Sequence, residues 1–422
     1  MREMKNSGFS WLGEIPKNWS MQRVKHGFTR KNEKAMKENP VILSLARTGV
    51  KVRDVSNNEG QIAESYFNYN PVEPGDLLLN PMDLYSGANC SVSNVSGVIS
   101  PAYINLKSKD GINPFFYDYY FKVQYWMMAF FSYGKGVSFD NRWTLNAETL
   151  MNYPIVALPY DEQCKIADYL DKKCSKIDAI IEKQQAVIEN LKAYKLSVIT
   201  EVVTKGLNPN AEMKDSEIDW IGEIPVHWNL CKLKYVTEIM RGKFNHRPRN
   251  DPKYYDGKYP FVQTGDVARA SKFIETYSQT LNELGYSVSK EFPKGSICMT
   301  IAANVGDVAV LNFDACFPDS VVGFVPVEEI HWNYLYYVLS AMKQQFTRNA
   351  IISTQRNLNV EIIKEEFIPI VAYQEQLDIA QYLDNKCSAI ENSILRKKDI
   401  IEKLTAYKKS LIFEVVTGKK EV

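Results

Sequence analysis

The sequence predicts an α+β protein in which two mixed α/β segments are joined by two long antiparallel helices that form a coiled coil. The main observation is an internal repeat, which implies a pseudo-two-fold arrangement. A Trp-x-Gly-Glu-Ile-Pro-x-x-Trp motif at residues 11–19 recurs 209 residues later (220 − 11), at residues 220–228. A second block, residues 162–175, recurs 213 residues later (375 − 162). Each copy of the second block opens a stretch of about 40 residues with helical periodicity.

The repeat divides the chain into four segments. Residues 1–158 and 208–371 are of mixed character, and residues 159–207 and 372–422 are helical. At about 150 residues per domain, a chain of 422 residues has room for roughly three domains. Each mixed segment is therefore expected to form one globular domain, and each helical segment is expected to follow one of them.

The first mixed segment contains strand-like runs at 41–45 and 76–79, with turn signals at Pro74-Gly75 and Ser86-Gly87. A helix rich in Tyr and Phe is predicted over 114–131. In the second mixed segment, residues 262–266 and 295–299 resemble strand ends, and residues 332–346 predict a helix.

The two helical segments are predicted to pair along a heptad seam. Apolar residues step by alternating three and four positions, which is the pattern of positions a and d in a coiled coil. Each helix would run about 40 residues, whereas ordinary helices average about a dozen. Polar seam positions, Gln184/Lys397 and Lys195/Lys408, are expected to fix register and orientation. The predicted seam comprises Leu170, Ile177, Ile181, Ile188, Leu191, Leu383, Ile390, Ile394, Ile401 and Leu404.

The first helix has an apolar face that is wider than a two-stranded seam requires. Ile180, Val187, Tyr194 and Ile199 lie beside the seam positions. A stripe of this width predicts that the helix packs on its twin and on something else.

Composition excludes several classes of protein. The net charge of +1 means that any DNA-binding face must be built from local clusters. The seven Cys are dispersed without a Cys-x-x-Cys pair, so neither a disulfide framework nor a zinc site is expected. No secretory signal and no apolar run of about 20 residues is seen, so we expect a cytoplasmic protein without a membrane partner.

The repeated motifs resemble those of a known family, the specificity subunits of type I restriction-modification systems. The resemblance rests on the Trp motif that opens each half and on Glu-Gln-x-x-Ile-Ala-x-Tyr-Leu-Asp at 162–171 and 375–384. It also rests on the Glu-Val-Val-Thr that ends each helix. One departure is that residues 158–161 and 372–374 replace the more typical Leu-Pro-Pro-Leu before Glu-Gln.

This resemblance implies what each segment does. Residues 1–158 and 208–371 would be target recognition domains, each reading one half of a split, asymmetric sequence in double-stranded DNA. The helices at 159–207 and 372–422 would be a spacer and would dock two modification subunits that methylate adenine. Restriction motor-nuclease subunits would join in the full complex. The chain itself would catalyse nothing and bind no cofactor, because S-adenosylmethionine, ATP and Mg²⁺ are expected on the partner subunits.

Parts of the sequence are compatible with two other functions. The first is an enzyme: Asn113-Pro114-Phe115-Phe116 is similar to the Asn-Pro-Pro-Tyr motif of amino-methyltransferases. It lacks the second Pro, however, and fits simple helix initiation better; no phosphate-binding Gly-rich loop is present. The second is a coiled-coil scaffold whose two domains bind proteins rather than DNA. Salt-dependent binding to duplex DNA would separate this from the restriction-modification function.

Candidate DNA-contacting residues are basic or polar residues in predicted loops. A second type of candidate is an Arg just before a predicted helix, where it could hold a phosphate together with backbone amides. The alternative there is that Asn146 and Asn359 simply cap the helices. The repeated Trp residues are expected to be core anchors that tie each domain to the helices. The candidates are Arg47, Thr48, Lys51, Arg53, Arg142, Arg241, Lys243, Arg247, Arg249 and Arg356.

Overall fold

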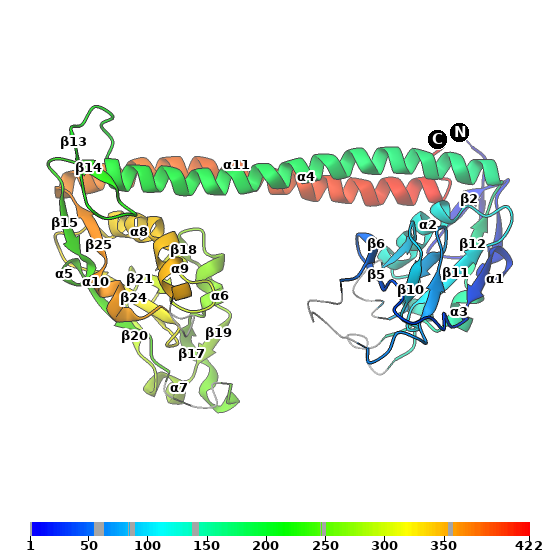
Figure 1. Ribbon diagram of the computed structural model, residues 1–422, viewed down its shortest axis with the longest axis horizontal. Helices are drawn as coiled ribbons and strands as arrows, with labels where there is room; N and C mark the ends of the chain where they lie inside the picture. The colour runs from blue at the N-terminus through cyan, green and yellow to red at the C-terminus, as the bar shows by residue number, and fades with distance from the viewer. Residues whose placement is uncertain are drawn as a thin grey trace. The chain divides into compact units, whose positions relative to one another are not determined.

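The computed structural model describes residues 2–54, 63–82, 84, 89–136, 143–244, 246, 250–352 and 358–422. The chain divides into two compact units (Figure 1). Unit 1 comprises Met1–Gln184 and Asp399–Val422, and unit 2 comprises Gln185–Lys398. The two long helices, α4 (Tyr160–Lys205) and α11 (Tyr373–Val416), therefore each contribute a segment to both units.

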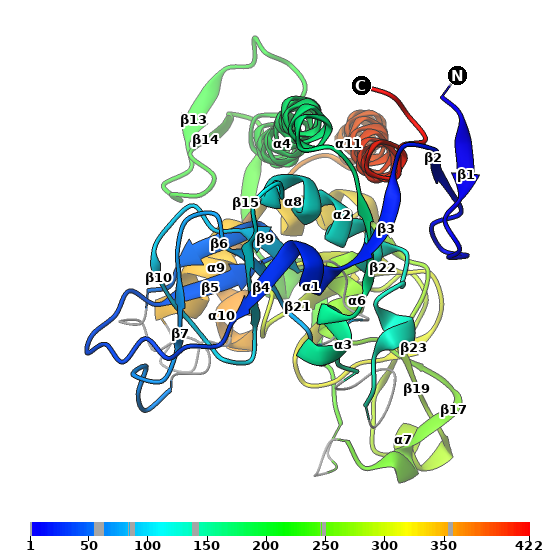
Figure 2. The ribbon, with the colours of Figure 1, turned by 90° about the vertical axis from the view of Figure 1, so that its right-hand side faces the viewer.

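Unit 1 is built on a four-stranded antiparallel sheet with the strand order β4-β11-β8-β9. Helix α2 (Pro114–Trp126) lies between this sheet and the long helices (Figure 2). The sheet strands are β4 (Phe28–Lys31), β11 (Ile104–Ser108), β8 (Leu77–Leu79) and β9 (Cys90–Val92). The other elements are β1 (Met4–Asn6), β2 (Glu14–Pro16), β3 (Ser20–Arg23), α1 (Val24–Gly27), β5 (Leu43–Ala46), β6 (Gly49–Val52), β7 (Asn70–Val72), β10 (Gly97–Ile99), η1 (Phe131–Tyr133), α3 (Ala147–Met151) and β12 (Pro154–Ala157).

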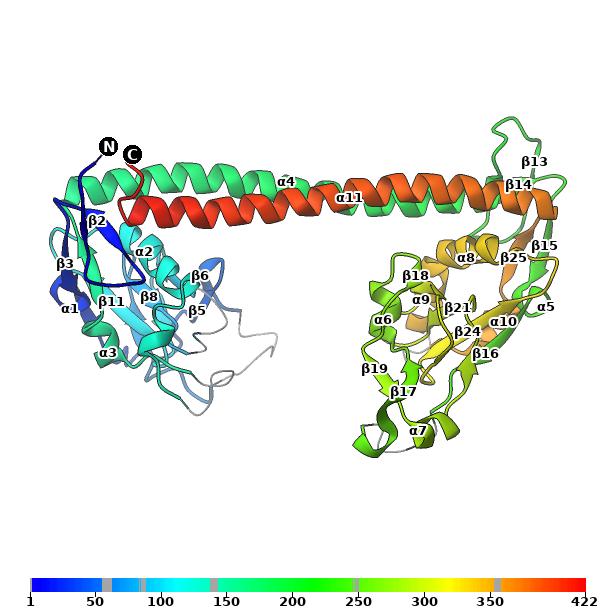
Figure 3. The ribbon, with the colours of Figure 1, turned by 180° about the vertical axis from the view of Figure 1, so that it is seen from behind.

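Unit 2 contains a five-stranded sheet with the order β16-β24-β21-β22-β18, covered by α8 (Trp332–Ala341) (Figure 3). A second sheet has the order β19-β17-β23-β20. The strands of the first sheet are β16 (Thr237–Arg241), β24 (Val321–Pro326), β21 (Ile297–Thr300), β22 (Val308–Leu311) and β18 (Phe273–Ile274). The other elements are β13 (Met213–Asp215), β14 (Glu223–Pro225), β15 (Asn229–Lys232), α5 (Leu233–Val236), η2 (Pro252–Tyr254), β17 (Tyr255–Phe261), α6 (Thr264–Arg269), β19 (Gln279–Leu281), α7 (Glu283–Ser287), β20 (Glu291–Phe292), β23 (Ala315–Cys316), α9 (Lys343–Ile352), α10 (Val360–Glu365) and β25 (Phe367–Ile370).

The two units share more than their repeated motifs. The order β4-β11-β8-β9 in unit 1 is the order β16-β24-β21-β22 in unit 2, with the same antiparallel pairings. Each unit also contains an equivalent two-stranded antiparallel sheet, formed by β3 and β12 in unit 1 and by β15 and β25 in unit 2. The sequence indicates a duplicated frame around unlike inserts. The structure shows that the inserts also share a sheet, and that they differ in what is added to it.

The additions are specific to each unit. Unit 1 adds the β5–β6 hairpin and the β7–β10 pair, whereas unit 2 adds β18 and the second sheet. The common core constrains the side chains of the shared sheet. The two units can therefore present different surfaces to a ligand mainly through the added elements.

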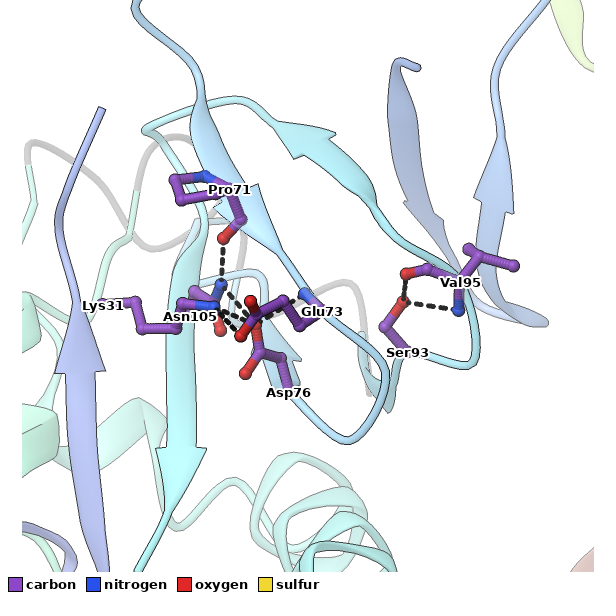
Figure 4. A network of polar contacts seen from close by, with 7 residues as sticks. All are labelled: Lys31, Pro71, Glu73, Asp76, Ser93, Val95 and Asn105. Carbon is purple, nitrogen blue, oxygen red and sulfur yellow. Dashed lines mark hydrogen bonds and ion pairs between the residues drawn. The ribbon is translucent and has the colours of Figure 1, made fainter. Parts of the chain in front are cut away.

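A buried polar network holds the sheet of unit 1 to the segment before β8 (Figure 4). The carboxylate of Asp76 accepts hydrogen bonds from Lys31 at 2.8 Å, from the backbone N–H of Glu73 at 2.9 Å and from Asn105 at 3.2 Å. The Asn105 amide also donates to the carbonyl of Pro71 at 2.9 Å. Burial lowers the pKa of Lys31, but hydrogen bonds to Asp76 and Glu73 outweigh it, and the pKa is raised overall. The charge of Asp76 is therefore paired where desolvation would otherwise be costly.

The long helices run antiparallel within each unit. In unit 1, Lys408 of α11 forms an ion pair with Asp178 of α4 at 2.6 Å. Ile166, earlier on α4, and Val415, later on α11, line the same pocket, as antiparallel helices require. In unit 2, Lys195 forms an ion pair with Glu391. Gly206 follows the last residue of α4 in unit 2 and has φ +73°. It lies close to Trp228 and to Glu375, a residue in the first turn of α11. A positive φ and this close approach favour glycine as the residue that ends the helix.

Element boundaries differ from the sequence prediction at several places. Residues 262–266, which resemble a strand end in the sequence, follow β17 and lead into α6. The strand expected at 41–45 is β5, which runs over Leu43–Ala46. The helix expected over 114–131 ends at Trp126, and Met128 has φ 57°. The helix expected over 332–346 is two helices, α8 and α9, which are separated at Met342. Among the described helices, none is long and apolar enough to cross a membrane.

Candidate nucleic-acid interface

The repeated Trp-Glu pair joins the mixed α/β part of each unit to a long helix. The indole N–H of Trp19 donates to Glu162 at 3.1 Å, and that of Trp228 donates to Glu375 at 3.0 Å. Both indoles are fully buried. The prediction that these Trp residues are core anchors is therefore confirmed for Trp19 and Trp228, which leaves them unavailable for stacking on bases.

The repeated Gln that follows each Glu is a second link. The side chain of Gln376 accepts a hydrogen bond from the backbone N–H of His331 and donates to the carbonyls of Glu329 and Val371. Gln163 makes the matching set of bonds in unit 1: it accepts from the backbone N–H of Asn113 and donates to the carbonyls of Gly111 and Leu158. The recurrence of the Glu-Gln motif therefore has a structural explanation. The motif holds the helix that covers the sheet against the start of the long helix.

The repeated Asp of Tyr-Leu-Asp is a third link. Tyr119 donates to Asp171 at 2.7 Å, and Tyr337 donates to Asp384 at 2.6 Å. Asp384 also pairs with Lys272, whose ammonium lies 5.2–5.6 Å from four aromatic rings. Burial raises the pKa of Asp384, but hydrogen bonds, first from Lys272 and then from Tyr337, outweigh it and hold the pKa below its ordinary value.

The first predicted DNA-contacting cluster lies on the β5–β6 hairpin. Ala46 pairs with Gly49, so Arg47 and Thr48 form its two-residue turn, and both side chains are exposed. Lys51 is exposed on β6, and Arg53 is half-buried just after it. The hairpin is held by Leu43 and Leu45 and other residues of a small core. A rigid base of this kind suits a loop that positions polar groups for a ligand.

The second cluster lies at the end of β16. Arg241 and Lys243 are exposed on either side of buried Gly242. The Arg241 Nε–H donates to the carbonyl of Asp319 at 2.6 Å. A Cβ at Gly242 would lie 2.3 Å from the carbonyl oxygen of Pro318, so only glycine fits there. The backbone contacts therefore fix the point from which both cations extend.

The remaining candidates, Arg142, Arg247, Arg249 and Arg356, lie outside the described residues. Their neighbours support the capping role considered for the two Asn residues. Asn146 accepts a hydrogen bond from the backbone N–H of Thr149 at 2.7 Å and caps α3. Asn359 accepts one from Glu361 at 3.1 Å and caps α10.

The predicted seam residues are all shielded from solvent to some degree. Five of them are buried: Leu170, Ile177, Ile188, Leu383 and Ile390. The other five are half-buried: Ile181, Leu191, Ile394, Ile401 and Leu404.

Beside the seam lies an exposed apolar stripe on each long helix. Val187 and Tyr194 are 38% and 55% exposed on α4. Their counterparts 213 residues later, Ile400 and Tyr407, are 38% and 54% exposed on α11. The spacing of seven residues places each pair on one side of its helix. The broad stripe seen in the sequence is thus only partly covered within this chain.

Comparison with known proteins places the chain among DNA specificity proteins. Residues 225–403 match the family model of the type I restriction modification DNA specificity domain. The MjaVIII specificity subunit of a type I restriction enzyme from Methanocaldococcus jannaschii is 25% identical over 82% of this chain and 80% of its own length. The putative MjaX specificity subunit of the same organism is 24% identical over 97% of this chain and 95% of its own length.

A solved structure has a similar fold. It was described for complex assembly and conformational transition of the type I R-M system. It superposes with a TM-score of 0.69, covering 96% of this chain and 99% of the other, at 14% sequence identity. At this identity the likeness concerns the fold alone.

Proposed function

Because the chain belongs to the family of type I restriction-modification specificity subunits, we propose that each of its units reads one half of a bipartite, asymmetric DNA target. We further propose that the long helices dock two adenine methyltransferase subunits. The observation that carries the first part is the shared sheet with different additions in each unit. The same frame would place each unit on DNA in the same way, while unlike additions would read unlike half-sites.

The base-reading residues are proposed to come from the added elements and the loops beside them. Arg47, Thr48, Lys51 and Arg53 would act in unit 1, and Arg241 and Lys243 in unit 2, with Arg142, Arg247, Arg249 and Arg356 kept as candidates. Arg and Lys can donate to guanine edges and to phosphates, and hydroxyl groups such as that of Thr48 can bind either.

The docking proposal is supported by the equivalent apolar stripes. Val187 and Tyr194 on α4 have the same exposure as Ile400 and Tyr407 on α11. Exposed apolar side chains repeated along a helix face suit a helix of a partner protein. Two equivalent stripes imply two copies of that partner, and a motor-nuclease subunit would join the complex afterwards.

The docking surface can be tested by charge substitution. Tyr194→Asp should remove one methyltransferase subunit from the complex and Tyr407→Asp the other, so the double variant should bind none. Gln185→Asp, at an exposed position on the other flank of the seam, is the matched control. Native mass spectrometry gives the stoichiometry. Full assembly by the double variant would place docking elsewhere.

We also propose that the chain is not itself an enzyme, and that S-adenosylmethionine, ATP and Mg²⁺ act on its partners. The purified chain, incubated with DNA and labelled S-adenosylmethionine, should transfer no methyl group. Transfer by a clean preparation would contradict this. The alternative function, a scaffold that binds proteins only, predicts no duplex binding at low salt and none of the steep salt dependence that phosphate contacts produce.

A further inference from the structure

Each unit contains a cleft between its recognition domain and the helix pair. In unit 1 the cleft has a volume of about 560 Å³ and is lined by the tip of the β5–β6 hairpin, the end of α2, and both long helices. In unit 2 the cleft has a volume of about 700 Å³ and is lined by α4 and the start of α9. Both volumes are within the range of about 300–1,000 Å³ that is typical of ligand sites.

The two clefts share one wall under the internal repeat. Four residues of α4 line the cleft of unit 2, and the residues 213 positions later on α11 line the cleft of unit 1. The four pairs are Lys192/Thr405, Lys195/Lys408, Leu196/Lys409 and Ile199/Ile412. The wall formed by these helix residues therefore belongs to the shared frame, whereas the opposite wall differs: it comes from the β5–β6 hairpin and α2 in unit 1 and from α9 in unit 2.

The two clefts also share a charge pattern. The side chains lining the cleft of unit 1 include four cations, Arg47, Lys122, Lys408 and Lys409, and one carboxylate, Asp178. The lining of the unit 2 cleft also includes four cations and one carboxylate. These are Lys192, Lys195, Lys343, Arg348 and Glu189. In a chain with a net charge of +1, two sites with this excess favour an anionic ligand.

Most of these cations already have a carboxylate partner. Lys408 pairs with Asp178 and Lys122 with Asp118, both at 2.6 Å. In unit 2, Lys195 pairs with Glu391, Lys343 with Asp307 at 2.5 Å, and Lys192 with Glu189 at 2.8 Å.

Each cleft retains one cation without an ion pair in the described part of the chain. In unit 1 this is Lys409, whose ammonium lies 5.7 Å from the centre of the Trp126 ring. In unit 2 it is Arg348, which is exposed on α9. These two side chains can bind an outside anion without first breaking an ion pair.

Hydroxyl groups complete the cleft linings. Thr48, Ser175 and Thr405 line the cleft of unit 1, and Thr347 lines that of unit 2. Thr405 and Thr347 donate to helix carbonyls at 2.7 and 2.8 Å, which holds their oxygens in place. Lysine, arginine and small hydroxyls together are the groups that hold the DNA backbone.

We propose that the two clefts hold phosphates of the DNA backbone, with Lys409 and Arg348 as the positioning residues. This inference rests on the proposed function, since it requires that the chain bind DNA. The cleft of unit 1 is continuous with the hairpin turn of Arg47 and Thr48, which is already a candidate for DNA contact. On each long helix the cleft lies on the opposite side of the seam from the apolar stripe, so the ligand of the cleft differs from the docked protein. The contacts of Lys409 and Arg348 carry no sequence information and fix the placement of each unit on the duplex.

The test uses the full chain assembled with its methyltransferase, and duplexes with and without the mapped target. Lys409→Ala and Arg348→Ala are compared with Lys403→Ala, an exposed lysine on another side of α11. Each cleft variant should weaken binding to both duplexes by roughly threefold to tenfold. Each should also reduce the magnitude of the slope of log K against log salt by about one. The methylated sequence should not change.

The outcomes separate this inference from the proposed function. Slopes equal to that of the Lys403→Ala control, in a complex that still selects its target, would refute phosphate binding in the clefts alone. Loss of methyltransferase assembly in the cleft variants would also refute it, because the clefts would then be protein docking sites. Failure of the unaltered complex to prefer any DNA sequence would refute the proposed function itself.

Discussion

At the scale of single residues, the repeated motifs link the globular part of each unit to a long helix through hydrogen bonds. Gln376 is 1% exposed and satisfies one backbone N–H and two carbonyls. The sequence motif that is typical of the family thus has a structural role. It contacts the part of each unit that is common to both units. Recognition must come from residues that the repeat does not contain.

Replacement of Gln376 by Met should destabilise unit 2. The thioether fills a similar volume but leaves buried backbone groups of His331, Glu329 and Val371 unpaired, at about 1–3 kcal/mol for each group. We expect faster hydrogen exchange in β21 and β24 and an earlier urea transition of unit 2. Gln374→Met, at an exposed position on the same helix, is the control. Equal hydrogen-exchange rates and equal urea transitions for the two variants would show that the hydrogen bonds of Gln376 do not stabilise unit 2.

Asp384 should make unit 2 sensitive to acid. Its pKa in the folded state is lowered, so its ionised form stabilises the fold above its ordinary value of 3.8. That stabilisation is lost as the pH falls below 3.8 and through the lower value of the folded state. The difference in unfolding free energy between the wild type and Asp384→Asn should therefore be largest near neutral pH and shrink below 3.8. A difference that does not change with pH would contradict the role of its charge.

At the scale of elements, the sequence predicted the long helices best because a heptad pattern persists over many turns. The predicted helical segments, 159–207 and 372–422, enclose α4 and α11. The sheets were predicted poorly, since strands of two to seven residues carry little periodicity. Nothing in the sequence indicated that both inserts share one strand order, because that similarity lies in backbone pairing and not in residue identity.

The candidate site was predictable only in part, for a related reason. Basic loop residues such as Arg47 and Arg241 were visible as local clusters. The clefts were not, because Lys409 and Arg348 come together with their neighbours only when distant segments pack. The heptad pattern marks Lys195 and Lys408 as polar seam positions, but it does not show their partners, Glu391 and Asp178, which lie on the opposite helix.

Two neighbouring isoleucines on α4 should respond differently to a charge. Ile181 is half-buried against the core of unit 1, so Ile181→Asp should cost roughly 1–3 kcal/mol, because it removes apolar contacts and partly desolvates a carboxylate. Ile180 is 44% exposed, so Ile180→Asp should leave stability almost unchanged and weaken only methyltransferase docking. Urea unfolding and gel filtration with the partner measure both effects. Equal unfolding midpoints for the two variants would contradict the assignment of Ile181 to the seam between the two helices.

At the scale of the whole molecule, the two long helices supply nearly interchangeable pieces to the two cores. The α11 residues in the core of unit 1 have counterparts on α4 in the core of unit 2. The pairs are Leu411/Val198, Ile412/Ile199, Val415/Val202 and Val416/Val203. Only the first pair differs in side-chain type, by one methylene, worth about 1 kcal/mol. Lys195 could likewise replace Lys408 opposite Asp178.

A fragment of residues 1–207 should therefore form a homodimer. Alone, it would leave the core of unit 1 without its α11 segment, and a second copy can supply α4 in its place. An antiparallel pair of identical helices is isologous and closes with two-fold symmetry. Light scattering should give twice the mass of the fragment. A folded monomer would show that the two helices are not equivalent.

The most direct test of the central claim, that each unit reads its own half-site, is to map methylated adenines in cells that carry the methyltransferase with either the full chain or the fragment 1–207. The full chain should give one asymmetric motif of two defined parts separated by unspecified bases. The fragment should give an interrupted palindrome made of one of those parts and its inverse, because half-sites mirror protein symmetry. A continuous motif for the full chain, or the parental asymmetric motif for the fragment, would contradict the claim.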